Sequence, residues 1–161
     1  MKTLIAYASK TGVVEKCARI LAEKLPGAEV CNLHRGATNP ADYDCVVVGG
    51  SIRAGALSPE TALFLDQCRD TLLRKKLGLF LCCGADDQAE EAFARNIAPE
   101  LLAHAAVHMA FGGELNLDGA HGLERWMMKF MRKSAEKEGT LMHLFPERMD
   151  AFAAALEKEE S

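Results

Sequence analysis

The chain has 161 residues, of which 49% are hydrophobic and 26% charged, and its formal net charge is −4 at pH 7. This length suits one domain, and the composition excludes a disordered, collagen-like or coiled-coil chain. The acidic balance argues against a nucleic-acid-binding module, because contacts with phosphate need a basic surface. No apolar run approaches the roughly 20 residues of a membrane-spanning helix. We therefore expect one domain over residues 1–161, cytoplasmic because no signal-peptide pattern opens the sequence.

Strand-like and helix-like segments alternate along the chain. In chain order, the hydrophobic pattern predicts strand 3–8, helix 13–25, strand 28–33, strand 43–48 closed by 49–51, helix 58–74, strand 77–83, a turn at 84–87, a helix to about 102, strand 105–111, helix 123–137 and a last helix from about 146. Continuous apolar runs indicate strands that are buried on both faces. Ser58 is expected to cap the helix that begins at Pro59.

This alternation predicts an α/β fold, a doubly wound three-layer sandwich with a five-stranded parallel sheet. Five strands in a chain of this length suit the strand order 2-1-3-4-5. Folds of this order bind ligands beyond the carboxyl ends of the strands, where the first and third strands meet. The loops that follow Ala8, Val48 and Cys83 are therefore the predicted site.

Cysteine and histidine spacing gives no sign of a metal site. The six cysteines match neither a zinc pattern nor a Cys-x-x-Cys pair, so we expect reduced thiols in the core. Cys82 and Cys83 are adjacent on a predicted strand, so at most one of them can face a site. The five histidines show no ligand spacing with a carboxylate, and we expect no bound metal.

The first of these loops has the composition of an anion site. Ser9, Thr11 and Gly12 come just before the predicted helix that starts at Val13, and Lys10 adds a positive charge. Amides at a helix start point outward and favour an anion, although an ordinary helix cap has a similar composition. The P-loop and Gly-x-Gly-x-x-Gly fingerprints are absent, and so are the acidic residues of a phosphorylated receiver domain.

Residues 7–18, Tyr-Ala-Ser-Lys-Thr-Gly-Val-Val-Glu-Lys-Cys-Ala, resemble the flavodoxin signature that binds the phosphate of FMN. Tyr7, Ser9, Gly12 and Ala18 match that pattern, whereas Val14 stands where the family usually has a phosphate-binding Thr. The resemblance implies FMN as the cofactor, and the Val14 amide can still donate a hydrogen bond. The cofactor-binding residues that it implies are Ser9, Lys10, Thr11, Gly12, Val13, Val14, Gly50, Ser51, Ile52, Arg53, Cys83, Gly84, Ala85 and Asp86.

A second resemblance concerns residues 49–55 and 125–131. The Ser-Ile-Arg-x-Gly run and the Met-rich basic helix are similar to those of menaquinone-dependent protoporphyrinogen dehydrogenases, a flavodoxin-like branch of haem biosynthesis. This likeness implies oxidation of a porphyrinogen coupled to a quinone. The alternatives are an electron carrier that docks with a redox protein, and a scaffold domain that has lost its flavin.

Arg53 is the predicted catalytic residue. The loops that follow the third and fourth strands contain no aromatic residue to stack on a flavin ring. A guanidinium near the ring would stabilise the negative charge of the reduced flavin and raise its potential. We therefore hypothesise a two-electron oxidoreductase, with a loop cation that pairs with a neighbouring acid as the alternative role for Arg53. Asp86 and Asp87 either contact the ring or cap the next helix.

The predicted helix 123–137 has two unlike faces. Its apolar residues fall on one arc and its basic residues on the opposite arc, the latter being Arg125, Lys129, Arg132 and Lys133. An ordinary helix that packs on a sheet has this pattern. The other two interpretations are a flexible wall for a large planar substrate or quinone, and a basic contact with a membrane surface.

Overall fold

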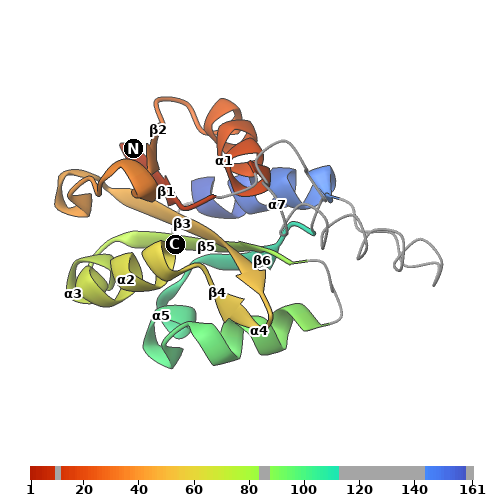
Figure 1. The fold of residues 1–161 in the computed structure, drawn as a ribbon. Helices are drawn as coiled ribbons and strands as arrows, with labels where there is room; N and C mark the ends of the chain where they lie inside the picture. Colours follow the sequence, from red (N-terminus) through yellow and green to blue (C-terminus); the bar gives the residue numbers. More distant parts are fainter. Residues whose placement is uncertain (10–11, 84–87, 113–143, 159–161) are drawn as a thin grey trace.

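The computed structural model describes residues 1–9, 12–83, 88–112 and 144–158 (Figure 1). Within these residues a parallel sheet forms the centre of the molecule. Its strands are β1 (Thr3–Tyr7), β2 (Glu29–Asn32), β3 (Cys45–Arg53), β5 (Lys76–Cys82) and β6 (Val107–Ala110). They lie in the order β2-β1-β3-β5-β6, which confirms the predicted 2-1-3-4-5 arrangement. A short strand β4 (Ala56–Leu57) pairs antiparallel with the end of β3.

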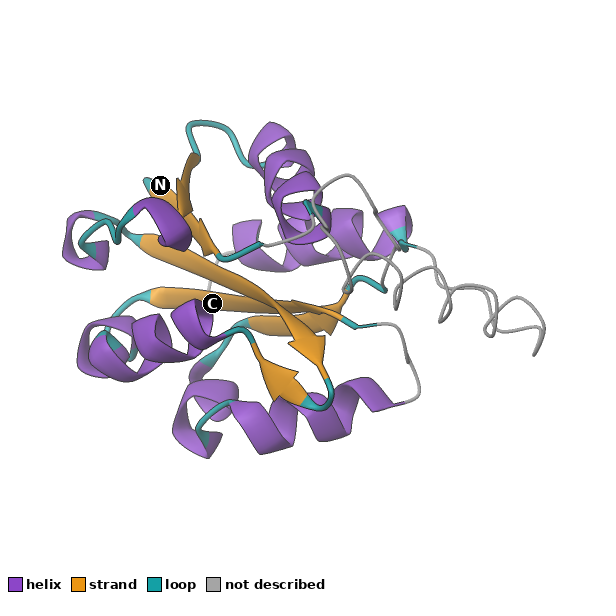
Figure 2. Ribbon diagram, viewed as in Figure 1, coloured by secondary structure: helices purple, strands orange, loops and turns teal. Residues whose placement is uncertain are grey.

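Helices cover both faces of this sheet (Figure 2). One face carries α1 (Val13–Lys24) and α7 (Pro146–Glu157). The other face carries α2 (Pro59–Gln67), α3 (Arg69–Leu72), α4 (Ala89–Asn96) and α5 (Pro99–His104). Two 3-10 turns, η1 (Leu33–Arg35) and η2 (Pro40–Asp42), join β2 to β3. The predicted doubly wound three-layer sandwich is therefore confirmed.

The strands alternate their side chains between two hydrophobic cores. In β1, Ile5 packs on the α1 and α7 side, whereas Leu4 and Ala6 pack on the α2 to α5 side. Such alternation follows from the two-residue period of a strand. Both faces are covered, so strands of this kind form continuous apolar runs in the sequence.

The predicted end of the third strand at residues 49–51 is wrong. β3 continues to Arg53 and reverses into β4 through Ala54 and Gly55, whose φ angles are 51° and 80°. Two successive residues with positive φ form the tight turn that suits the right-handed twist of a hairpin. Alanine rarely adopts this conformation, and for that reason the pattern did not predict the turn.

Two predicted helices are each divided in two. The predicted 58–74 helix is interrupted at Cys68, which separates α2 from α3. The predicted helix that ends near residue 102 is interrupted at Ile97, which is extended, and at Ala98, whose φ of −55° and ψ of 135° are not helical, before Pro99 starts α5. Proline disfavours helical geometry in the residue before it, so Pro99 was the overlooked signal. The predicted helix 123–137 lies outside the described residues.

Candidate functional site

A hydrogen bond joins Ser9, which follows β1, to Gly12, which precedes α1. The Ser9 Oγ accepts a hydrogen bond from the Gly12 amide at 3.0 Å, and Gly12 has a φ of 87°. Val13 and Val14 are buried in the core, 7% and 1% exposed, so their side chains offer no group to a ligand. The first amides of a helix have no acceptor within it. This end of α1 therefore offers backbone donors to an anion. Residues 10 and 11 lie outside the described part.

A hydrogen bond to Glu15 joins the first turn of α1 to β1, and an ion pair within α1 holds the same carboxylate. The Tyr7 hydroxyl donates to the Glu15 Oε1 at 3.1 Å, and the same oxygen accepts from the Arg19 Nη2 at 3.1 Å. The hydrogen bond from Arg19 lowers the pKa of the Glu15 carboxyl. Burial, and next the hydrogen bond to Glu15, raise the pKa of Tyr7. The guanidinium thus offsets the one acidic side chain in the first turn of α1.

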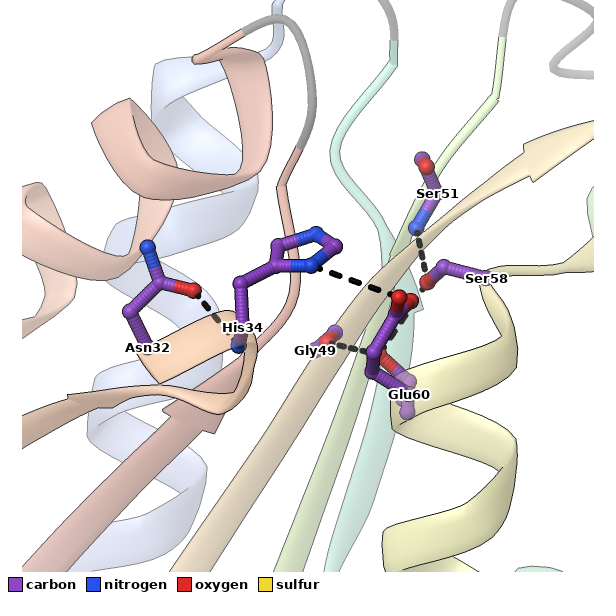
Figure 3. A network of polar contacts seen from close by, with 7 residues as sticks. Asn32, His34, Gly49, Ser51, Ser58 and Glu60 are labelled. Carbon is purple, nitrogen blue, oxygen red and sulfur yellow. Dashed lines mark hydrogen bonds and ion pairs between the residues drawn. The ribbon is translucent and has the colours of Figure 1, made fainter. Parts of the chain in front are cut away.

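Hydroxyl groups organise the end of β3 (Figure 3). The buried Thr61 hydroxyl donates to the Gly49 carbonyl oxygen at 3.1 Å and accepts from the Ser58 hydroxyl at 3.1 Å. Ser58 Oγ in turn accepts from the Ser51 amide at 3.4 Å. Ser58 therefore occupies the predicted cap position of α2, but its hydroxyl makes no bond to that helix's backbone.

Gly50 has a packing role at this place. A Cβ on Gly50 would lie 2.8 Å from the Leu57 Cδ1 and 2.9 Å from the hydroxyls of Ser58 and Thr61. These contacts are too short for any side chain, so glycine is needed for α2 to approach β3. The packing is a sufficient reason for Gly50, in addition to the cofactor contact that the resemblance implies.

A cavity of about 240 Å³ opens where β1 and β3 end, and β4, α2 and η1 complete its walls. It is lined by Ala8, His34, Ser51, Arg53, Ala56, Leu57, Ser58, Pro59 and Glu60. The His34 Nδ1 lies 3.3 Å from the Glu60 Oε1 across this space (Figure 3). The Glu60 Oε2 is buried and has no hydrogen-bond partner among the described residues. A buried oxygen without a donor is costly in free energy, which marks the cavity as a place for a polar ligand group.

The segment after β5 carries the third predicted group of site residues. The Cys83 amide donates to the Gly112 carbonyl at 3.0 Å. The Cys82 Sγ lies 3.6 Å from the Cys17 Sγ, and this contact, followed by burial, raises the pKa of Cys82. Both Cys82 and Cys83 are buried, and all six cysteines are free thiols. Gly84, Ala85 and Asp86 lie outside the described residues.

Comparison with protein families decides the identity of the fold. The family model described as "Flavodoxin domain" matches residues 4–141. This chain belongs to the flavodoxin domain family. The match includes the β1–α1 turn and the β3–β4 hairpin, and it supports FMN as the cofactor and electron transfer as the activity. A search of curated proteins finds no significant match.

Solved structures agree with the flavodoxin fold. Oxidised flavodoxin 1 from Bacillus cereus aligns over 100% of both chains at 17% identity, with a TM-score of 0.55. A short-chain flavodoxin associated with a non-canonical PDU bacterial microcompartment covers 97% of this chain and 96% of its own, at 17% identity and a TM-score of 0.60. The Fusobacterium nucleatum flavodoxin bound to flavin mononucleotide covers 95% of both chains at 12% identity, with a TM-score of 0.55.

The flavodoxin fold brings together residues that are distant in sequence. Ser51 and Arg53 line the cavity, and Ser9 and Gly12 shape the turn that leaves β1 next to it. The contact between His34 and Glu60 was not predicted. The spacing of histidines along the chain can indicate metal ligands, but it cannot show that residues of η1 and α2 meet in the folded protein. Among the described residues, no cluster of three or more His, Cys, Asp or Glu side chains could hold a metal ion. No described helix has the length and hydropathy to span a bilayer.

Proposed function

We propose that this flavodoxin domain binds FMN at the carboxyl ends of β1, β3 and β5 and acts as a two-electron oxidoreductase. FMN, when bound, accepts and returns electrons, and the protein sets its orientation and electrostatic surroundings. The observation that carries the proposal is the hydrogen bond between Ser9 and Gly12 at the start of α1, within a chain that the flavodoxin domain model matches.

The backbone supplies most of the phosphate site. Amides of Val13 and Val14 have no acceptor within α1 and can donate to phosphate oxygens, assisted by the positive end of the helix dipole. Val14 packs its side chain into the core, so the hydroxyl that its family counterpart offers is replaced here by hydrophobic burial. The residues present thus fit an anionic phosphate without a side-chain donor at position 14.

Arg53 is the proposed electrostatic group of the reaction. It is exposed, lines the cavity and belongs to the last residue pair of the β3–β4 hairpin. A positive charge there stabilises negative charge that develops on a neighbouring ligand. The guanidinium stays charged at all physiological pH values, so this contribution does not depend on pH.

Potentiometry on the FMN-loaded protein tests this role. Arg53→Ala is expected to lower the midpoint potential, and Arg53→Lys to retain most of it. The matched control is Arg95→Ala, which removes a surface guanidinium that pairs with Glu91 on α4. An unchanged potential in Arg53→Ala would refute the catalytic role.

The course of FMN reduction in the parent protein distinguishes the three candidate functions. Reduction in a single two-electron step supports an oxidoreductase, and two separated one-electron steps support an electron carrier. Failure to bind FMN supports a scaffold.

Protoporphyrinogen, with a quinone as electron acceptor, is the specific substrate that we propose. The support is the Ser51-Ile52-Arg53 run before Gly55, together with the similarity of residues 125–131, which lie outside the described part. Anaerobic assay with protoporphyrinogen and a soluble quinone measures this directly. Reduction of the quinone only when both FMN and the porphyrinogen are present is the expected result, and no turnover would exclude the substrate.

Peripheral contact with a membrane is a further part of the proposal. It is supported only by the sequence of residues 123–137, where four basic residues lie within nine positions. Sedimentation with anionic liposomes is expected to fall when Arg125, Lys129, Arg132 and Lys133 are all changed to Gln. Equal sedimentation of this variant and the parent protein would contradict the contact.

A further inference from the structure

The β3–β4 hairpin has too few contacts between its own strands to be stable by itself. Its ladder consists of two residue pairs, Ile52 with Leu57 and Arg53 with Ala56. Its turn places Ala54 in the left-handed region, where an L side chain other than glycine is strained. Short isolated hairpins are marginal in water, and strained residues persist only where the surroundings over-determine them. Another part of the molecule must therefore stabilise this turn.

Asn96, the last residue of α4, makes the required contacts. Its Oδ1 accepts a hydrogen bond from the Leu57 amide at 3.0 Å. Its Nδ2 donates to the Gly55 carbonyl at 3.0 Å and to the Ala92 carbonyl at 2.9 Å. The bond to Ala92 holds the side chain against its own helix. The other two bonds hold Gly55, in the turn, and Leu57, in β4. An amide can do this because it carries donors and an acceptor on one planar group.

We infer that Asn96 is a positioning residue for the flavin site, because it fastens the β3–β4 hairpin to α4 and so keeps Ile52 and Arg53 at the carboxyl end of β3. The inference rests on the proposed function for its catalytic consequence. On the other side, the hydroxyls of Ser58 and Thr61, at the start of α2, are hydrogen-bonded to each other and to the β3 backbone, and so they hold the β3 strand of the same hairpin. The hairpin is thus held between two helices, and Asn96 provides the attachment that reaches the turn itself.

Hydrogen exchange on the ligand-free full chain tests the attachment. Asn96→Asp is nearly isosteric and retains the acceptor for Leu57, but it places a carboxylate against the carbonyl oxygens of Gly55 and Ala92. Asn39→Asp is the matched control, because within the described part of the chain the Asn39 side chain only accepts a hydrogen bond, from the Ala41 amide at 3.0 Å, before β3 begins. We expect exchange at residues 52–57 to rise about tenfold in Asn96→Asp and to stay unchanged in the control. Equal protection in both variants would overturn the inference.

FMN binding and potential then separate positioning from general stabilisation. Asn96→Ala is expected to weaken FMN binding about tenfold, by fluorescence titration, whereas Asn39→Ala leaves the affinity unchanged. In addition, Arg53→Ala should shift the midpoint potential less in the Asn96→Ala background than in the parent, since the guanidinium is no longer held in place. Parent-like affinity and a full Arg53 effect in that background would refute the positioning role.

The two proposals can fail separately. If the parent protein binds no FMN, the proposed function fails, and hydrogen exchange still decides whether Asn96 fastens the hairpin. If the parent binds FMN and the Asn96 variants bind it equally well, the proposed function stands and the inference about Asn96 fails. If Asn96→Ala does not fold, the same FMN titration and potentiometry on Asn96→Asp decide between these outcomes.

Discussion

Single residues at the site show where local preference yields to tertiary contact. Ala54 takes a φ of 51° in a turn where glycine or asparagine is usual. Thr61 is 1% exposed, a position where an apolar side chain is usual, but its hydroxyl donates a hydrogen bond to the Gly49 carbonyl. In each case the residue type is acceptable only because a neighbouring element stabilises the arrangement.

The conformation of Ala54 gives a prediction about branched side chains. Ala54→Val should lower the free energy of unfolding by about 1–2 kcal/mol, because a β-branched residue is strongly disfavoured at positive φ. Ala56→Val is the matched control, since Ala56 is an exposed strand residue two positions later in the same hairpin. Urea unfolding measures both. A stability of Ala54→Val equal to that of Ala56→Val would contradict the strained turn.

Tyr43 gives a prediction about alkaline pH. The hydrogen bond that its hydroxyl donates to Glu29, followed by burial, raises the pKa of Tyr43 from 10.0 to about 12. Because the pKa of Tyr43 is higher in the folded chain than in the unfolded chain, protonated Tyr43 stabilises the folded state. This contribution is complete below pH 10 and is lost as the pH rises toward 12. In a Tyr7→Phe variant, which has Tyr43 as its one tyrosine, tyrosinate absorbance should appear near pH 12. Ionisation of the folded protein near pH 10 would contradict this assignment.

At the level of elements, α7 joins the sheet through a cluster of three rings. Phe152 on α7 lies edge-on to Phe80 of β5 at 6.3 Å and to Phe111 at 5.3 Å, and Phe80 stacks on Phe111 at 5.1 Å, all measured between ring centroids. Gly78 leaves room for the helix, since a Cβ there would lie 2.9 Å from the Phe152 ring. This packing covers β5 on the side that also receives α1.

Removing one ring from this cluster should therefore be costly. Phe152 is fully buried, and Phe152→Ala is expected to lower the free energy of unfolding by about 3–5 kcal/mol. Leu63→Ala is the control, because Leu63 is 55% exposed on α2 and should change the stability by less than about 0.5 kcal/mol. Urea unfolding compares the two variants. A loss below about 1 kcal/mol for Phe152→Ala would show that α7 does not stabilise the sheet in this way.

For the whole molecule, the strand order accounts for the position of the proposed FMN site. The chain adds strands on one side of β1 (β2) and then on its other side (β3), so α1, which follows β1, and α2, which follows the β3–β4 hairpin, lie on opposite faces of the sheet. The space between them cannot be filled by either helix, and a ligand can enter there. The cavity lined by Ala8, Ser51 and Arg53 lies at this position.

Ligand binding at this place should stabilise the entire domain. FMN at about 100 times its dissociation constant is expected to add about 2.7 kcal/mol, which raises the melting temperature by roughly 5–10 °C for a chain of this size. Riboflavin lacks the phosphate and should give a clearly smaller shift at equal concentration. Differential scanning fluorimetry measures both, and equal shifts would contradict a phosphate site at the β1–α1 turn.

Patterns in the sequence were sufficient to predict the strand order and the start of α1. Strands buried on both faces must be apolar throughout, so residues 3–8 and 43–48 are recognisable without any partner. A helix start after Ser9 and Gly12 likewise depends on neighbours within four residues. The extension of β3 to Arg53 was not predictable in this way, because its turn is stabilised by Asn96, which follows some forty residues later in the chain.

The amino-acid order alone therefore establishes an α/β fold and points to an anion site at the start of α1, since both depend on local periodicity and on the backbone of one turn. The tertiary structure alone decides the pairing of His34 with Glu60, the hydroxyl series of Thr61 and Ser58, and the attachment of the hairpin by Asn96. Hydrogen bonds and ion pairs act over about 3 Å. Residues so far apart in the chain meet at that distance only after the sheet has assembled and brought its strand ends together.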